Sequence, residues 1–117
     1  MQERLNALVL AGEKVATAGL WQQDYVDEGE ELEVVGERQV LLDGDGRRLV
    51  FVEITRVERV PFSEVRWEFA DAEGEGFTSI EHWRDGHRSY YAGEGVTVDD
   101  HDLVVCVWFE VVQRHKM

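Results

Sequence analysis

A lysine and a threonine three residues apart have the clearest catalytic potential in this 117-residue chain. Lys14 and Thr17 stand in the segment Gly12-Glu13-Lys14-Val15-Ala16-Thr17, and a carboxylate, Glu73, lies far downstream. An amine can serve as a base, a hydroxyl as a nucleophile and a carboxylate as a proton carrier. These residues also have ordinary structural uses, because a lysine at a helix end balances the helix dipole and threonine favours strands. By residue type alone the structural use is the more common one.

Other polar clusters do not match ligand-binding patterns. His82 and His87 are five residues apart, which puts them on different sides of a helix, so no zinc site is predicted. Asp43-Gly44-Asp45 lacks the further oxygen ligands and the final glutamate of a calcium loop. The segments 44–46 and 74–76 are too short for dinucleotide or phosphate loops and are predicted turns. We expect no metal and no organic cofactor.

Apolar periodicity predicts the elements of the first half of the chain. Apolar residues at three-and-four spacing before Gly12 predict a short helix over residues 2–11, which places Lys14 just beyond a helix end. Residues 38–42 and 47–60 flank a glycine-containing turn and predict an antiparallel hairpin, with the second strand covered on much of both faces.

The acidic segment between these elements is predicted to be irregular. Six carboxylates fall between Asp24 and Glu33, with few apolar partners. Such a charge run favours a solvated loop.

Two helices and an apolar strand are predicted in the second half. Ser63 is the expected cap of a helix ending toward Gly74, and the segment 78–81 has the spacing of a capping box for a second helix. Trp83, His87 and Tyr91 fall four apart and would share one stripe of that second helix. The almost wholly apolar segment 103–112 suits a central strand of a closed or nearly closed sheet. The order of elements predicts an α+β class and a single domain over residues 1–117.

Composition and charge limit the classes of function. Twenty-five acidic against 12 basic residues give a formal net charge of −13, which repels bulk DNA and anionic membranes. Cys106, the only cysteine, lies between two valines and is expected to be a buried core residue rather than half of a disulfide. No stretch is apolar enough for a membrane span, and the start lacks the pattern of a secretion signal. We therefore expect a cytoplasmic protein; its oligomeric state is left open.

Motifs along nearly the whole chain resemble the ASCH domain family, whose fold is similar to the PUA domain. The matching segments are Gly12-x-Lys14-x-x-Thr17, Val40-x-x-Asp43-Gly44-x-Gly46, Val52-Glu53-Ile54-Thr55, Pro61-Phe62-x-x-Val65, Ala70-x-x-Glu73-Gly74-Glu75-Gly76, Trp83-Arg84-x-x-His87 and Leu103-Val104-Val105-Cys106-x-x-Phe109. The resemblance implies a small PUA-like β-barrel decorated by helices. It also implies a cleft lined by Lys14, Thr17 and Glu73.

The resemblance implies two classes of function. Some small ASCH proteins are amidohydrolases that deacetylate N(4)-acetylcytidine, and others are ribonucleases or RNA-binding modules. In one mechanism for the first class, Lys14 is the base for a Thr17 nucleophile, and Glu73 either protonates the leaving amine or orients the water that releases the acyl group. In the other, a charged Lys14 stabilises the oxyanion while Glu73 activates water. We expect a nucleoside-like ligand or an RNA end, and binding of another metabolite without turnover stays open. Phe77 departs from the aspartate that many longer family members carry after the Glu-Gly-x-Gly element.

Further substrate-binding candidates carry less weight. Glu53 interrupts an apolar strand and is either ion-paired or directed at the cleft. Trp21 is the aromatic residue best placed to stack on a base. Arg84 and His87 are candidates for holding an anion, although a histidine on an aromatic stripe is more often structural. Glu75 completes the set because it lies in the same motif as Glu73.

Overall fold

The strand β4 (Leu103–Val112) is the centre of the sheet. In this computed structural model, which describes residues 2–112, β4 pairs antiparallel with β1 (Ala16–Leu20) on one side and with β3 (Arg48–Pro61) on the other. Its alternate residues enter two separate cores. Val104 and Cys106 belong to one core, and the other core contains Val105, Val107 and Phe109. The predicted central strand is confirmed, and so is the burial of Cys106, which is 2% exposed.

The second strand pair is the predicted hairpin. β2 (Arg38–Leu42) pairs antiparallel with β3, and the turn between them is held by the Asp43 carboxylate, which accepts from the backbone N–H groups of Asp45 and Arg47. The expectation that β3 is covered on much of both faces is wrong, because Phe51 is 44% exposed.

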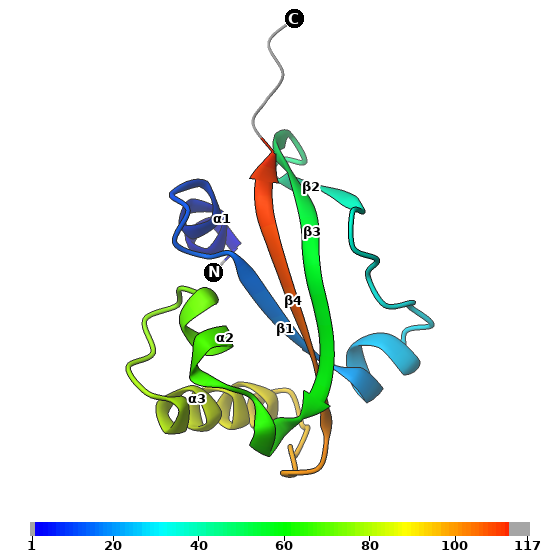
Figure 1. Ribbon diagram of the computed structural model, residues 1–117, viewed down its shortest axis with the longest axis vertical. Coiled ribbons are helices and arrows are strands. Elements are labelled where there is room, and N and C mark those ends of the chain that lie inside the picture. Colours follow the sequence, from blue (N-terminus) through cyan, green and yellow to red (C-terminus); the bar gives the residue numbers. More distant parts are fainter. Residues whose placement is uncertain (1, 113–117) are drawn as a thin grey trace, which may run out of the picture.

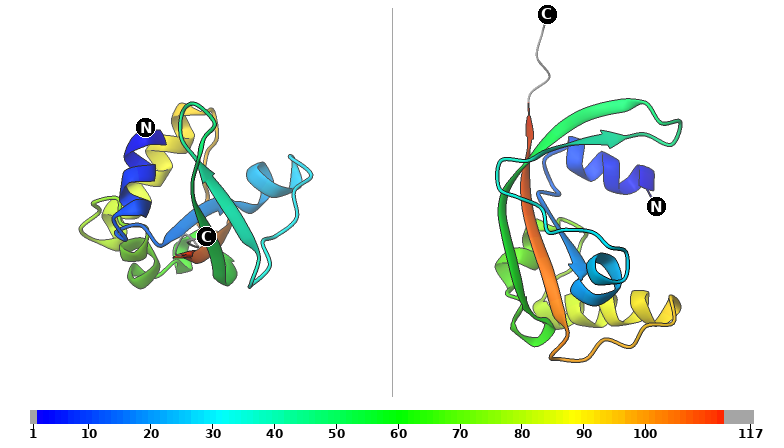
Figure 2. Two further views of the ribbon diagram at one scale, coloured as in Figure 1. Left: turned by 90° about the horizontal axis from the view of Figure 1, so that it is seen from above. Right: turned by 90° about the vertical axis from the view of Figure 1, so that its right-hand side faces the viewer.

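The sheet is curled but open. Its strand order is β1-β4-β3-β2, so within residues 2–112 β1 and β2 are its two edges. The architecture is therefore a half-barrel with helices, an α+β fold that is less closed than the predicted barrel. The sheet curves around the helix α1 (Gln2–Leu10) and the short π-helix η1 (Trp21–Val26) (Figure 2).

The opposite face of the sheet is covered by the two helices α2 (Trp67–Ala72) and α3 (Ile80–Gly93) (Figure 1). Phe69 of α2 and Trp83 of α3 belong to the same buried cluster as Cys106. Ser79 is the N-cap of α3 and accepts the His82 N–H at 3.0 Å. The helix predicted from the segment 78–81 is confirmed, with its cap at the second residue of that segment.

Two sequence predictions of local structure are wrong. Ser63 does not cap a helix, since it lies in the short 3-10 turn η2 (Phe62–Glu64) and α2 begins only at Trp67. Tertiary hydrogen bonds explain this, because the N–H groups of Phe62 and Ser63 donate to the carbonyls of Asp102 and Asp100.

The acidic segment is not wholly a loop either. Asp24 and Tyr25 lie in η1, where the Asp24 carboxylate accepts the Leu20 N–H at 2.8 Å. Tyr25 is buried, and its hydroxyl donates a hydrogen bond to the Glu33 carboxylate at 2.8 Å. The buried ring of Tyr25 thus holds the acidic segment against the fold, although the charge of that segment predicted a solvated loop.

Candidate functional site

Lys14 is buried at the point where the chain passes from α1 into β1. The helix α1 ends at Leu10, Gly12 in the following turn takes φ +78°, and the Lys14 N–H donates to the Leu8 carbonyl at 3.1 Å. The side chain is buried although it carries an ammonium, and the Lys14 residue as a whole is 6% exposed. Its Nζ donates to the Ala16 carbonyl at 2.8 Å. A buried ammonium requires charged partners.

The loop after α2 supplies those partners. The Val15 N–H donates to the Ala72 carbonyl at 2.8 Å, which fixes this loop against the Lys14 segment. Gly74 takes φ +64°, and a Cβ at this position would lie 1.9 Å from the Glu13 carbonyl oxygen. Only glycine therefore allows the loop to approach so closely, and the residues on each side of it, Glu73 and Glu75, turn toward Lys14.

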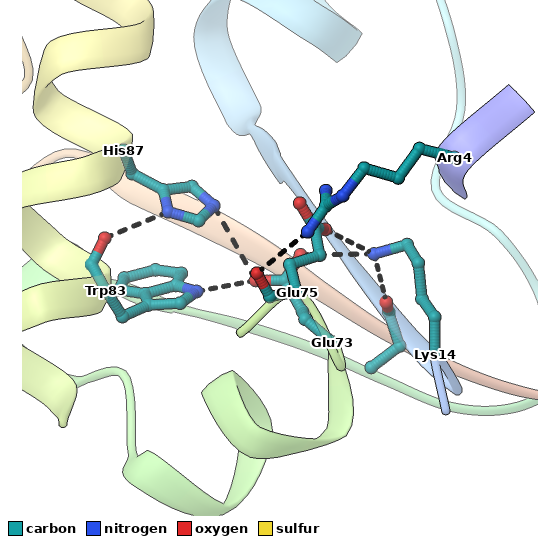
Figure 3. A network of polar contacts seen from close by, with 7 residues as sticks. Arg4, Lys14, Glu73, Glu75, Trp83 and His87 are labelled. Atoms are coloured by element: carbon teal, nitrogen blue, oxygen red, sulfur yellow. Dashed lines mark hydrogen bonds and ion pairs between the residues drawn. The ribbon is translucent and has the colours of Figure 1, made fainter. Parts of the chain in front are cut away.

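The three side chains form a charged cluster. Lys14 Nζ lies 2.7 Å from Glu75 Oε2 and 3.6 Å from Glu73 Oε2 (Figure 3). Arg4 of α1 donates to the Glu75 backbone carbonyl at 3.2 Å, on the exposed side of the cluster. An ion pair as buried as that of Lys14 and Glu73 is costly to break, because either partner alone would be an uncompensated buried charge.

Glu73 is the deepest member of the cluster. It is 2% exposed, and its Oε1 accepts the Trp83 indole N–H at 2.5 Å and lies 3.6 Å from His87 Nε2. Burial raises the pKa of the Glu73 carboxyl, although Lys14, His87 and the Trp83 hydrogen bond act in the opposite direction. Trp83 and His87 stack with their ring centroids 4.1 Å apart, as the predicted stripe on α3 requires.

Thr17 lies apart from this cluster but shares a cavity with Lys14. The cavity, of about 270 Å³, lies on the concave face of the sheet between α1 and β2, with an apolar floor from β3 and β4. Its polar lining consists of Asn6, Lys14, Thr17, Glu33 and Gln39. Ala16 and Ala18 pack toward the α2 and α3 side, so the alternation of β1 turns Thr17 to the opposite face. Lys14 and Glu73 are thus brought together, Lys14 and Thr17 line one cavity, and Glu73 is not among its lining residues.

An acidic cavity adjoins the first. It has a volume of about 350 Å³ and shares Thr17, Glu33 and Gln39 with it. Carboxylates dominate its polar lining: Asp24, Glu30, Glu31, Glu33 and Glu37.

Of the predicted substrate-binding residues, Glu75 and His87 belong to the Lys14 cluster. The other three, Trp21, Glu53 and Arg84, lie outside it. Trp21 stacks on Tyr25 and under the Arg59 guanidinium. Glu53 is ion-paired with Arg38 at 3.1 Å, one of its two predicted roles. Arg84 donates to the carbonyls of Ser63 and Val65. In the described residues, no cluster of His, Cys, Asp and Glu could hold a metal ion.

Sequence reasoning missed the other polar residues of the cavity. Glu33 is the last carboxylate of the acidic segment and Gln39 lies on β2. Their approach to Thr17 depends on the curl of the sheet, which no local sequence signal reports. The Tyr25 and Glu33 pair is the one local sign, since a tyrosine in an acidic run is a candidate anchor.

The half-barrel with its helices places this chain among small α+β proteins, and comparisons with known proteins identify its family. The family model described as "ASCH domain" matches residues 1–113, so the chain belongs to the ASCH domain family. No helix of the described residues has the length and hydropathy to cross a membrane.

Solved structures agree with this family. An ASCH domain from Lactobacillus crispatus JV V101 has 33% identity and a TM-score of 0.78, over 93% of this chain and 70% of that one. Protein EF3133 from Enterococcus faecalis V583 has 29% identity and a TM-score of 0.79, over 97% and 77% of the two chains. The hypothetical protein PH0355, at 21% identity and a TM-score of 0.63 over 96% and 94%, shares the fold. Curated proteins gave no significant match.

Proposed function

We propose that this ASCH protein is a metal-independent amidohydrolase of N(4)-acylated cytidine-type nucleosides. The observation that carries the proposal is the buried Lys14 ammonium, held by two carboxylates at the wall of a cavity that also contains the Thr17 hydroxyl. The cavity volume of about 270 Å³ is just below the ~300–1,000 Å³ range of small-molecule sites. That size suits a nucleoside better than a polymer.

The charge of the surroundings supports a neutral substrate. Five carboxylates line the adjoining cavity, and the net charge of the chain is −13. A phosphate beside these carboxylates would be repelled, whereas an acylated nucleoside without phosphate would not. Two of the arginines that could oppose this repulsion are ion-paired, Arg38 with Glu53 and Arg88 with Asp100.

Lys14 is assigned the stabilisation of the oxyanion. An ammonium has three N–H donors, and among the described contacts two lie at hydrogen-bond distance, to Glu75 and to the Ala16 carbonyl. Glu73 is farther away, at 3.6 Å, and we assign the third donor to the acyl oxygen of a substrate. This favours the mechanism in which Lys14 stays charged.

The proton transfers are assigned to the residues of the cavity. Thr17 Oγ1 attacks the acyl carbon and gives its proton to Glu33, and the C–N bond then breaks as Glu33 returns that proton to the cytosine amine. Water, deprotonated by Glu33, then attacks the acyl-threonine ester. The bond from the acyl carbon to Oγ1 breaks as Glu33 returns the proton to Thr17 Oγ1, so that the acid and free Thr17 are released. Glu73, which is buried away from the cavity, acts on Lys14 and is a positioning residue.

The proposal is tested by a substrate panel. N(4)-acetylcytidine, its 5′-monophosphate and a short RNA are incubated with wild-type protein, Lys14→Met and Arg47→Met, and release of cytidine, acetate or RNA fragments is measured. Arg47 is exposed in the hairpin turn and is not among the residues that line the cavity, so its substitution removes the same charge outside the site. We expect turnover of the nucleoside, weaker turnover of the monophosphate, and loss of about 10²–10³-fold in kcat/KM in Lys14→Met only.

The alternative is an RNA-binding or RNA-cleaving module. Binding or cleavage of the RNA that depends on Lys14, with no turnover of N(4)-acetylcytidine or its monophosphate, would refute the amidohydrolase proposal and favour this alternative.

A further inference from the structure

The ring of His87 is oriented by its own helix. His87 Nδ1 lies 3.0 Å from the Trp83 backbone carbonyl oxygen. A carbonyl oxygen only accepts, so the hydrogen of this bond belongs to Nδ1. The stacking of the ring on the Trp83 indole fixes its plane. As a result Nε2 is the atom turned toward Glu73 (Figure 3).

The contact between His87 and Glu73 requires a proton. Nε2 lies 3.6 Å from Glu73 Oε1. In a neutral imidazole with hydrogen on Nδ1, Nε2 presents a lone pair, and a lone pair facing a carboxylate oxygen is repulsive. The repulsion disappears if either Nε2 or the carboxyl group carries one additional proton.

The balance of charge in the cluster leads to the same requirement. Lys14 contributes one positive charge and Glu75 one negative charge, and these cancel. Without an additional proton, Glu73 and neutral His87 would leave one uncompensated negative charge at a position that is almost fully buried. Such a charge is strongly destabilising. With the proton, the buried part of the cluster is neutral. The Arg4 guanidinium lies on the exposed side, where it donates to the Glu75 backbone carbonyl and is open to solvent.

The other groups around Glu73 do not supply this charge. Tyr91 of α3 and Cys106 of β4 also interact with it. Burial raises the pKa of the Tyr91 hydroxyl and raises the pKa of the Cys106 thiol to about 12, so both are neutral near physiological pH. Trp83 donates a hydrogen bond but carries no charge.

We propose that His87 is a positioning residue of the site, which shares one proton with Glu73 and thereby keeps the cluster with Lys14 and Glu75 neutral. The shared proton does not depend on which reaction the protein performs. Its effect on turnover rests on the proposed function: loss of the proton leaves a bare carboxylate beside Lys14, and this draws the ammonium away from a substrate oxygen. Turnover therefore falls on the alkaline side of the pH profile.

Two substitutions at His87 separate proton sharing from packing. His87→Gln keeps an amide donor near Glu73 but does not titrate, and His87→Phe keeps an aromatic ring against Trp83 without any nitrogen. In both variants Glu73 must hold the proton alone, so we expect the alkaline limb of kcat/KM to move to lower pH by about one unit or more. His87→Phe also loses the donor, so its kcat falls further. An unchanged limb with a uniformly lower kcat would overturn the proposal, because it indicates packing alone.

A measurement without substrate separates this proposal from the proposed function. Imidazole ¹⁵N chemical shifts of the wild-type protein are recorded between pH 5 and 10 (about 0.5-unit steps) and assigned with His87→Gln. We expect Nδ1 of His87 to be protonated throughout and its Nε2 signal to titrate at a different pH in Glu73→Gln. A His87 ring with hydrogen only on Nε2, or a titration that Glu73→Gln leaves unchanged, overturns the proposal. The expected shifts without any nucleoside turnover would refute only the proposed function.

Discussion

At the scale of single residues, the site depends on one close backbone approach. Gly74 brings the loop that carries Glu73 and Glu75 against the Glu13 carbonyl. This contact places both carboxylates within ion-pair distance of Lys14. The chemistry of the cluster is therefore set by a residue that has no functional group.

Gly74→Ala is expected to lower the free energy of unfolding by about 2–3 kcal/mol, because it combines an unfavourable positive φ with a clash against the backbone. Gly76→Ala is the matched control, since Gly76 takes φ +92° but a Cβ there meets no atom within 4 Å. Urea unfolding of both variants measures the difference. If the two variants lost the same unfolding free energy, the close approach at Gly74 would not contribute to stability.

The raised pKa of Glu73 predicts a pH-dependent stability. An acid whose pKa is raised in the folded state binds more protons there than in the unfolded chain, so stability is lost as pH rises above its ordinary value of 4.5. We therefore expect Glu73→Gln to gain in unfolding free energy relative to wild type as pH increases from that value. Denaturant titrations at a series of pH values measure the difference.

Glu37 provides a control of the opposite sign. Hydrogen bonds from Gln39 and from the Val34 N–H lower the pKa of its exposed carboxyl. Its contribution is present above the ordinary value and is lost as pH falls, so Glu37→Gln should lose stability relative to wild type as pH rises. A difference between Glu73→Gln and wild type that did not vary with pH would contradict the assignment for Glu73.

The sequence predicted part of the site at this scale. The resemblance implied Lys14, Thr17 and Glu73 as the lining of one cleft, with Glu75 as a further candidate, and the four-residue spacing identified the stripe of Trp83 and His87. That this stripe packs against Glu73 was not predicted, because the contact requires α3 to lie across the loop after α2. Local spacing carries no information about that long-range packing.

At the scale of elements, α3 holds the indole and imidazole partners of Glu73, and its start is fixed by Ser79. Ser79→Ala is expected to cost about 1 kcal/mol, since it removes the acceptor for the His82 N–H. Thr78→Ala is the matched control one residue earlier, outside the cap position, and should cost much less. Thermal unfolding compares the two variants. A larger loss of stability in Thr78→Ala would show that Ser79 is not the cap of α3.

Elements with strong local signals were predicted well. The hairpin turn and the apolar strand 103–112 have the expected bounds within one or two residues. The failures have a common cause in tertiary contacts. Phe62 and Ser63 bond to the segment before β4 instead of starting a helix, and Tyr25 is buried beneath an acidic surface.

At the scale of the whole molecule, acidic charge opposes folding. The net charge of −13 creates repulsion within the folded chain that added salt screens. We expect the unfolding free energy to rise by about 1 kcal/mol or more between low and physiological salt. The double variant Glu30→Gln with Glu31→Gln should be more stable at low salt and respond less to salt. A fall in wild-type stability with added salt would contradict this expectation.

The open half-barrel places its cavity between the two edge strands, with Thr17 on β1 and Gln39 on β2. Closure of the sheet would fill that space with paired backbone. The difference between the predicted barrel and the observed half-barrel is thus the feature that leaves room for a ligand. Strand count and order are tertiary properties, and the local patterns that predicted each strand do not determine them.

The central claim, that Lys14 and Thr17 act together on an acylated nucleoside, is tested most directly by a double-mutant cycle. Lys14→Met and Thr17→Val keep most of the side-chain shape and remove the ammonium and the hydroxyl, and folding of each variant is verified by its unfolding curve. We predict that each single substitution lowers kcat/KM for N(4)-acetylcytidine by about 10²-fold or more, and that the double variant is hardly slower than either. Losses that multiply, or single variants with nearly wild-type turnover, would contradict the account.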